Sequence, residues 1–275
     1  MDEFRNTEDA AKMTSETAHP AKILYGGGSA ECRPSTSNAK MAPEPEQFEA
    51  IREYNAAFEH VSPEVILRWA VETYAPRLAM ATAFGPEGCL LLSMLAGIDP
   101  NTYVFNLDTG YQFQETLATG DRIAREYGIT IDYQRPELSV EQFEKAHPHP
   151  LYRSDPGRCC HERKIKVFYR AIQGFDAWIS GIRRDQSSHR ATTPIVGWDR
   201  RFGLVKISPL ANWSRGDVWE RITRDVVPYN PLHDRGYPTV GCWPCTQPTE
   251  EGEGERAGRW KGTDKTECGL HLADT

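Results

Sequence analysis

The carboxyl-terminal part of this chain groups its cysteines with the neighbours that sulfur chemistry needs. Cys242 and Cys245 are two residues apart, a spacing that lets two sulfurs face one metal atom or one another. Cys268 follows in a glycine-containing stretch that holds four Arg or Lys residues after Cys245. A single thiolate among cations, close to a flexible end, suits a nucleophile that moves. We predict that the Cys242–Cys245 pair is anchored and that Cys268 is reactive.

A second cysteine pair, Cys159 and Cys160, lies earlier in the chain. Disulfide frameworks are rare in the cytoplasm, where we expect this protein, so two tight pairs favour a metal or redox centre. Adjacent cysteines suit the separate iron corners of a cubane cluster better than the fixed angles of one zinc ion. Residue types alone leave three possibilities open: an iron–sulfur cluster, a zinc ion and a metal-free redox site.

The composition limits the partners of the protein. The 275 residues carry a formal net charge of −7, which argues against a broad nucleic-acid-binding surface but permits a small anionic ligand in a basic pocket. The longest apolar run, residues 89–98, is too short to cross a membrane, and the charged first 20 residues do not resemble a signal peptide. We therefore expect a cytoplasmic protein with no membrane contact. The sequence leaves its oligomeric state open, a homo-oligomer included.

The order of apolar segments predicts how these residues are positioned. We expect a disordered leader over residues 1–45, an α/β domain over 46–248 and a mobile segment over 249–275. Strands are predicted at 78–84, 103–107, 129–133 and 177–181, with helices between them and a hairpin over 195–207. Such alternation favours a doubly wound, mainly parallel sheet. Ligands collect at the carboxyl ends of these strands, where the glycine turn 85–88 and the polar loop 182–190 follow.

The motifs together resemble one family. Cys159-Cys160, Cys242-x-x-Cys245 and the tail Lys265-Thr-Glu-Cys268-Gly-Leu-His271 closely resemble the assimilatory adenylyl-sulfate (APS) reductases, the iron–sulfur branch of the PAPS reductase family. The likeness runs from about residue 50 to the end of the sequence. It includes Leu107-Asp-Thr-Gly110, the stretch 181–186 and Arg256-Ala-Gly-Arg259-Trp260.

This resemblance implies a nucleotide-binding fold related to the ATP pyrophosphatases, or adenine nucleotide alpha hydrolases. It also implies a [4Fe-4S] cluster on Cys159, Cys160, Cys242 and Cys245. The substrate-binding residues that it implies are Phe84, Gly85, Leu107, Asp108, Lys164, Arg190, Arg256, Arg259 and His271. We leave Arg163, Arg183 and Arg184 out of the site and expect them to be solvated surface cations.

The resemblance further implies a reaction. Cys268 is expected to attack the sulfur of adenylyl sulfate, so that AMP leaves and an S-sulfocysteine forms; thioredoxin or a similar dithiol then releases sulfite. This places the protein in sulfate assimilation and cysteine biosynthesis. Arginine forks suit the sulfate and phosphate oxygens that must be neutralised first.

Three other functions remain to be weighed. A reductase of 3′-phosphoadenylyl sulfate (PAPS), or one of dual specificity, would look similar, although such enzymes generally lack the two cysteine pairs. A cluster-containing tRNA-thiolating enzyme would need an intact pyrophosphate loop, whereas residues 82–88 lack its paired glycines and aspartate. In a non-enzymatic zinc module, Cys268 would be incidental.

Overall fold

One twisted sheet positions the site. The computed structural model describes residues 42–271, so most of the predicted leader 1–45 lies outside the described residues. In that part six strands form a sheet in the order β3-β2-β1-β4-β6-β5. All neighbouring strands are parallel except β5 and β6, which form the predicted antiparallel hairpin. The doubly wound, mainly parallel fold is thus confirmed. The strands are β1 (Leu78–Thr82), β2 (Tyr103–Leu107), β3 (Ile131–Gln134), β4 (Ala177–Ile179), β5 (Val196–Asp199) and β6 (Leu204–Ile207).

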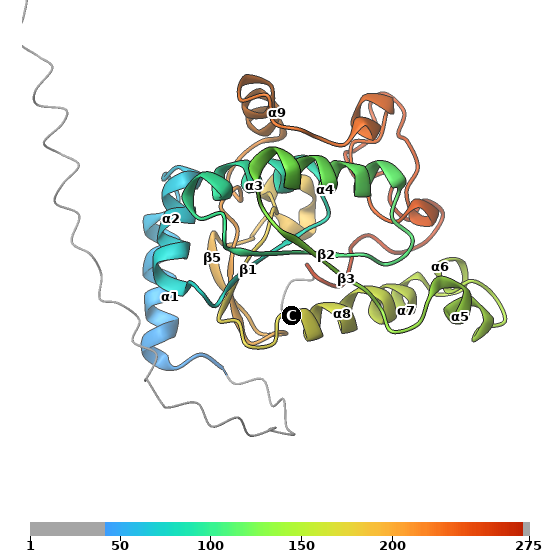
Figure 1. The fold of residues 1–275 in the computed structure, drawn as a ribbon, viewed down its shortest axis with the longest axis horizontal. Helices are drawn as coiled ribbons and strands as arrows, with labels where there is room; N and C mark the ends of the chain where they lie inside the picture. Colours follow the sequence, from blue (N-terminus) through green and yellow to red (C-terminus); the bar gives the residue numbers. More distant parts are fainter. Residues whose placement is uncertain (1–41, 272–275) are drawn as a thin grey trace, which may run out of the picture. The chain divides into compact units, whose positions relative to one another are not determined.

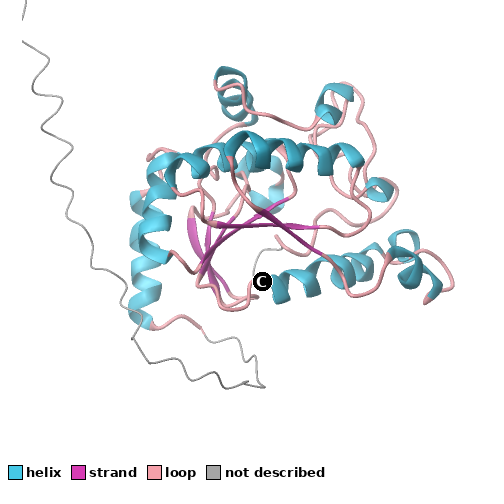
Figure 2. Cartoon of the chain, in the orientation of Figure 1, coloured by secondary structure: helices cyan, strands magenta, loops and turns pink. Residues whose placement is uncertain are grey.

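Helices cover both faces of the sheet (Figures 1 and 2). The α-helices are α1 (Pro45–Ala57), α2 (Pro63–Tyr74), α3 (Pro86–Ile98), α4 (Gln114–Tyr127), α5 (Val140–Lys145), α6 (Leu151–Ser154), α7 (Pro156–Cys160), α8 (Lys166–Ala171) and α9 (Arg215–Arg224). Short turns of 3₁₀-helix are η2 (Arg184–Gln186), η3 (Ser188–Arg190), η4 (Pro231–Arg235) and η5 (Trp243–Cys245). Within residues 42–271 no helix has the length and apolar character needed to span a bilayer.

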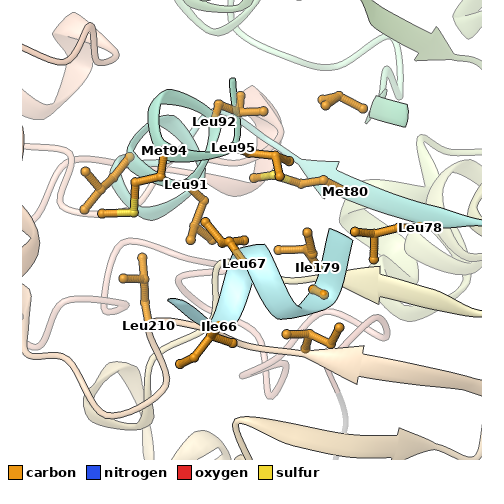
Figure 3. Close-up of a cluster of buried hydrophobic side chains, with 14 of the residues drawn as sticks. Ile66, Leu67, Leu78, Met80, Leu91, Leu92, Met94, Leu95, Ile179 and Leu210 are labelled. Atoms are coloured by element: carbon orange, nitrogen blue, oxygen red, sulfur yellow. The ribbon is translucent and has the colours of Figure 1, made fainter. Parts of the chain in front are cut away.

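Alternation along β1 divides the core into two layers. Leu78 and Met80 join a cluster with side chains of α2 and α3, such as Leu67 and Leu91 (Figure 3). Ala79, between them, faces the opposite layer, which contains Phe168 of α8 and neighbouring strand residues. Because successive side chains of a strand point to opposite faces, one buried strand supports both layers. The carboxyl end of β1 is thereby held firmly from both sides.

Helix boundaries follow local signals. Ser62 precedes Pro63, which occupies the first turn of α2, and Gly128 ends α4 in the left-handed conformation with φ 64°. Ser214 and Asp217 form a capping box at the start of α9, each side chain accepting a hydrogen bond from the other residue's backbone N–H. Each of these boundaries depends on residues that are neighbours in the sequence.

The helix that carries the first cysteine pair is not a regular α-helix. It begins as α7, passes through one π-helical turn, η1 (His161–Ile165), and continues as α8. Ile165 and Phe168 lie on its inner face, and both are buried. The wider turn inserts an extra residue between the cysteines and the core-packing residues of α8, a feature common at functional sites.

Candidate active site

A cavity of about 190 Å³ lies at the carboxyl ends of β1, β2 and β4. This is the edge where open α/β sheets bind ligands. The tail closes part of its wall, so residues far apart in the sequence meet here. The residues predicted from the sequence that line the cavity are Gly85, Leu107, Lys164, Arg190, Arg256, Arg259, Cys268 and His271.

Two predicted substrate residues direct their side chains elsewhere. Phe84 is fully buried in the core, 6.4 Å from the ring of Tyr133, and its backbone adopts φ 55°. Asp108 accepts hydrogen bonds from the Gly110 N–H at 3.0 Å and from Arg135 Nε at 2.8 Å. Neither residue lines the cavity. The positions of these side chains therefore do not support their assignment to substrate binding.

The four paired cysteines line one small neighbouring cavity. All are free thiols, and Cys242 Sγ lies 3.2 Å from Thr109 Oγ1. Burial, then the other thiols, raises the pKa of Cys159 to about 12 and that of Cys245 to about 11. Within residues 42–271 no three His, Cys, Asp or Glu side chains converge closely enough for one ion. Four sulfurs around one cavity fit a cluster with separate iron corners, each bound by one thiolate.

Lys164 connects the two cavities, since it lines both. It lies on the π-helical turn four residues after Cys160. Burial acts to lower the pKa of Lys164, but the nearby Cys242, Cys268 and Cys160 sulfurs outweigh it and hold the pKa above its ordinary value. Lys164 is therefore a cation placed between the paired cysteines and the tail cysteine.

Most charges around the larger cavity are paired. Glu267 accepts hydrogen bonds from Arg190 Nε at 2.8 Å and from Arg256 Nη2 at 2.9 Å. Two other lining carboxylates, Glu87 and Glu255, both pair with the buried Arg183. In the described part of the chain, Lys164 and Arg259 have no carboxylate partner within ion-pair distance, so the cavity retains positive charge.

Several buried donors at the cavity have no hydrogen-bond partner. Among residues 42–271, the Nε atoms of Arg256 and Arg259 and the Ser180 hydroxyl are in this state. Burial, followed by the charge of Arg190, lowers the pKa of Arg256 to about 10. Unsatisfied buried donors are costly unless a ligand or water meets them. The arrangement suits an anion with several oxygens beside the Cys268 thiol.

Sequence reasoning missed some residues of the site. Arg163 and Arg183 are buried rather than solvated, so that expectation is wrong: Arg163 donates to the Thr109 carbonyl at 2.6 Å, and Arg183 binds three carboxylates. Trp260 receives the Arg259 guanidinium at 4.4 Å from its ring centre. Glu267 could have been identified from the sequence, because it is an acidic residue next to Cys268 inside a basic motif.

Part of the predicted mobile segment is tied to the domain. Thr246 and Arg259 form an antiparallel bridge, and Gln247 N–H donates to the Gly258 carbonyl at 2.9 Å. A Cβ atom on Gly258 would lie 2.1 Å from the Gln247 carbonyl oxygen, so this approach requires glycine. The bridge holds the backbone of Arg259 beside Cys245. The predicted boundary at residue 248 therefore falls inside a paired unit.

Comparison with known proteins gives consistent relatives. Residues 77–248 match the family described as the phosphoadenosine phosphosulfate reductase domain. The chain is 43% identical over 220 residues to the adenosine 5′-phosphosulfate reductase of Salinibacter ruber, covering 80% of this chain and 87% of that protein. It is 44% identical to the phosphoadenosine 5′-phosphosulfate reductase of Gloeobacter violaceus, covering 78% and 90%.

A solved structure is also similar. The crystal structure of phosphoadenylyl-sulfate (PAPS) reductase from Candida auris, in a phosphate complex, superposes with a TM-score of 0.66 at 31% sequence identity. The match covers 75% of this chain and 99% of that chain. Sequence and fold thus point to the same family.

Proposed function

The chain belongs to the phosphoadenosine phosphosulfate reductase family, and from this premise we propose that it reduces adenylyl sulfate to sulfite and AMP. The reaction would serve sulfate assimilation and cysteine biosynthesis in the cytoplasm. The observation that carries the proposal is the Cys268 thiol in a cavity with buried Arg256 and Arg259 Nε atoms that have no hydrogen-bond partner among residues 42–271. A phosphate–sulfate anhydride supplies the oxygens that these donors lack.

The first step transfers the sulfonyl group to the protein. Arg256, Arg259 and Lys164 neutralise the oxyanions that shield the substrate sulfur. The Cys268 thiolate attacks this sulfur, a new S–S bond forms, and the S–O bond to the phosphate breaks as AMP leaves with the bonding pair. The product on the enzyme is S-sulfocysteine. His271 and Arg190 would complete the substrate contacts.

The second step needs two electrons from a dithiol such as thioredoxin. One donor thiolate attacks the Cys268 sulfur, sulfite departs, and a mixed disulfide forms. The second donor thiol resolves this bond, which regenerates Cys268 and leaves the donor as a disulfide. Cys268 is buried in the structure, so the residues around it must move before a donor protein can reach the sulfur.

Cys159, Cys160, Cys242 and Cys245 would hold a [4Fe-4S] cluster. When bound, this group supplies a charged, sulfide-rich body next to Lys164, and the reaction written above takes no electron from it. Metal analysis of protein purified without oxygen tests the assignment. About four irons per chain and an absorption band at about 400 nm support it, and stoichiometric zinc without iron refutes it.

Reduction of PAPS is the alternative, either in place of APS or as a dual activity. Relatives of both names are similarly close to this chain, at 43% and 44% identity. The two cysteine pairs favour the unphosphorylated substrate. Turnover of APS and PAPS by the same preparation decides between them, and a strong preference for PAPS would overturn the assignment.

The decisive experiment follows the sulfur. Incubation with ³⁵S-labelled adenylyl sulfate, without a dithiol, should place acid-stable label on the peptide that contains Cys268. Cys268→Ser should abolish this label and sulfite release, while Cys89→Ala should keep both because Cys89 is buried in α3. Addition of thioredoxin should release the label as sulfite. Label on another residue, or none in the wild type, contradicts the mechanism.

A further inference from the structure

The tail beyond Cys268 is held by the β5–β6 hairpin. The Gly269 carbonyl accepts a hydrogen bond from Arg201 Nη1. A Cβ atom on Gly269 would lie 3.2 Å from Ile165 Cδ1 and 3.3 Å from the same Nη1 atom, so the backbone fits closely between the two. Arg201 is itself held, because Tyr169 Oη donates to its carbonyl at 2.8 Å. The tail is therefore joined to the β5–β6 hairpin, and the hairpin is joined to α8.

His271 has a second attachment on the same side of the sheet. Its ring stacks on Trp178 with centroids 6.0 Å apart and an interplanar angle of 16°. Lys206 Nζ, from β6, lies 3.4 Å from His271 Nδ1 and 5.1 Å from the Trp178 ring centre. Burial, and after it the charge of Lys206, holds the pKa of His271 well below its ordinary value. The neutral imidazole can therefore accept a hydrogen bond from the ammonium group.

These contacts bracket Cys268. On one side, the Cys268 N–H donates to Glu267 Oε1 at 2.8 Å. On the other, the backbone N–H of His271 donates to the Cys268 carbonyl at 3.2 Å and closes a turn. Within this turn Gly269 contacts Arg201 and His271 contacts Lys206. Neither Arg201 nor Lys206 lines the cavity; Arg201 meets it through the tail, and Lys206 meets it through His271 of the tail and the Trp178 ring.

We propose that Arg201 and Lys206 are positioning residues: they dock the tail so that the Cys268 sulfur stays at the cavity during sulfonyl transfer. This inference rests on the proposed function and adds the residues that define the docked state. The donor step requires an undocked tail, so it does not use them. Small errors in the placement of a nucleophile slow its reaction strongly.

Two readouts test the dock with Arg201→Met, Lys206→Met and their combination. The first is alkylation of Cys268 by iodoacetamide without nucleotide, quantified on its peptide by mass spectrometry; we expect it to be several-fold faster than in the wild type. The second is single-turnover ³⁵S transfer from adenylyl sulfate, expected to be about tenfold slower in the double variant. AMP affinity should change less than about twofold, because neither side chain lines the cavity.

Matched variants separate docking from general damage. Arg224→Met removes an exposed arginine of α9 and should leave both rates unchanged. Arg201→Lys should restore part of the protection, and Gly269→Ala should mimic the loss without altering the hairpin. The proposal would be overturned if both single variants and the double variant were alkylated at the wild-type rate. It would also be overturned if their affinity for AMP fell by the same factor as their rate of sulfur transfer. Because alkylation needs no substrate, it tests the dock even if the wild type transfers no sulfur.

Discussion

At the scale of single residues, Glu267 pairs with two of the arginines that were expected to bind the substrate. Arg190 and Arg256 were predicted as ligands for substrate oxyanions, and their partner in the structure is the Glu267 carboxylate. Burial acts to raise the pKa of Glu267, but hydrogen bonds and charge from Arg190, with the charge of Arg256, hold it below its ordinary value. A tethered carboxylate thus occupies donors that an anionic ligand would use.

Replacement of this carboxylate should strengthen anion binding. In Glu267→Gln the side chain keeps its shape but no longer neutralises Arg190 and Arg256, so AMP should bind several-fold more tightly. Calorimetry measures this directly. Glu253→Gln, which removes a more exposed carboxylate paired with Lys261 at 3.4 Å, is the control and should leave affinity unchanged. Equal or weaker binding by Glu267→Gln would show that the carboxylate does not compete with the ligand.

Docking of the tail through the His271 imidazole should depend on pH. The pKa of His271 is lowered in the docked tail, whereas an undocked histidine titrates near its ordinary value of about 6.5. The undocked state therefore binds a proton first as pH falls, and docking weakens below about pH 6.5. An NMR titration should find the His271 pKa well below 6.5 and higher in Lys206→Met. A value at or above 6.5 in the wild type would contradict the docked geometry.

At the scale of elements, the segment after Cys245 is more ordered than its glycines suggest. Composition alone indicated a mobile stretch, because glycine permits both flexible turns and close backbone packing. Gly258 serves the second purpose, where its carbonyl pairs with Gln247. The sequence alone does not distinguish these two uses, because close packing depends on which segment lies opposite the glycine.

A methyl group at this position should therefore disrupt the site. Gly258→Ala must displace the Gln247 carbonyl, which should lower the free energy of unfolding by about 1–3 kcal/mol. Nucleotide affinity should fall with it, since Arg259 forms the bridge and Arg256 lies three residues before it. A Cβ atom on Gly254 would have no atom of the described residues within 4 Å, so Gly254→Ala serves as the control. Thermal melts and AMP titrations measure both effects; a Gly258 variant as stable as the Gly254 variant would refute the packing argument.

Much of the secondary structure could be predicted from local sequence signals. The bounds of β2, the capping box of α9 and the hairpin around residues 199–203 agree with the sequence, because each depends on neighbouring residues. The π-helical turn and the core position of Phe84 were not predicted, since both depend on packing from distant elements. Likewise, the basic residues of the tail marked the site, but which of them would be paired internally depended on the fold.

At the scale of the whole molecule, Arg183 joins separate parts of the chain. It pairs with Glu87 at the start of α3, with Asp185 in the loop after β4 and with Glu255 near the tail. Its side chain is 1% exposed. A buried cation with several carboxylates is costly to break, because the remaining charges stay uncompensated.

Loss of this cation should destabilise the entire domain. Arg183→Met should lower the free energy of unfolding by about 3–5 kcal/mol, as measured by urea denaturation. Arg184→Met removes the next arginine, whose pair with Glu59 is partly exposed, and should cost less than about 1 kcal/mol. Similar costs for the two variants would mean that the Arg183 network does not link these parts energetically.

The π-helical turn of residues 161–165 has a consequence for how this protein could lose activity. Because this turn holds one residue more than an α-helical turn, deleting one codon there would restore regular α-helical winding and leave Cys159 and Cys160 in nearly the same phase relative to α8. The core contacts of α8 would survive such a deletion. If the lost codon were that of Lys164, a descendant would still fold, yet the cation that lines both cavities would be gone.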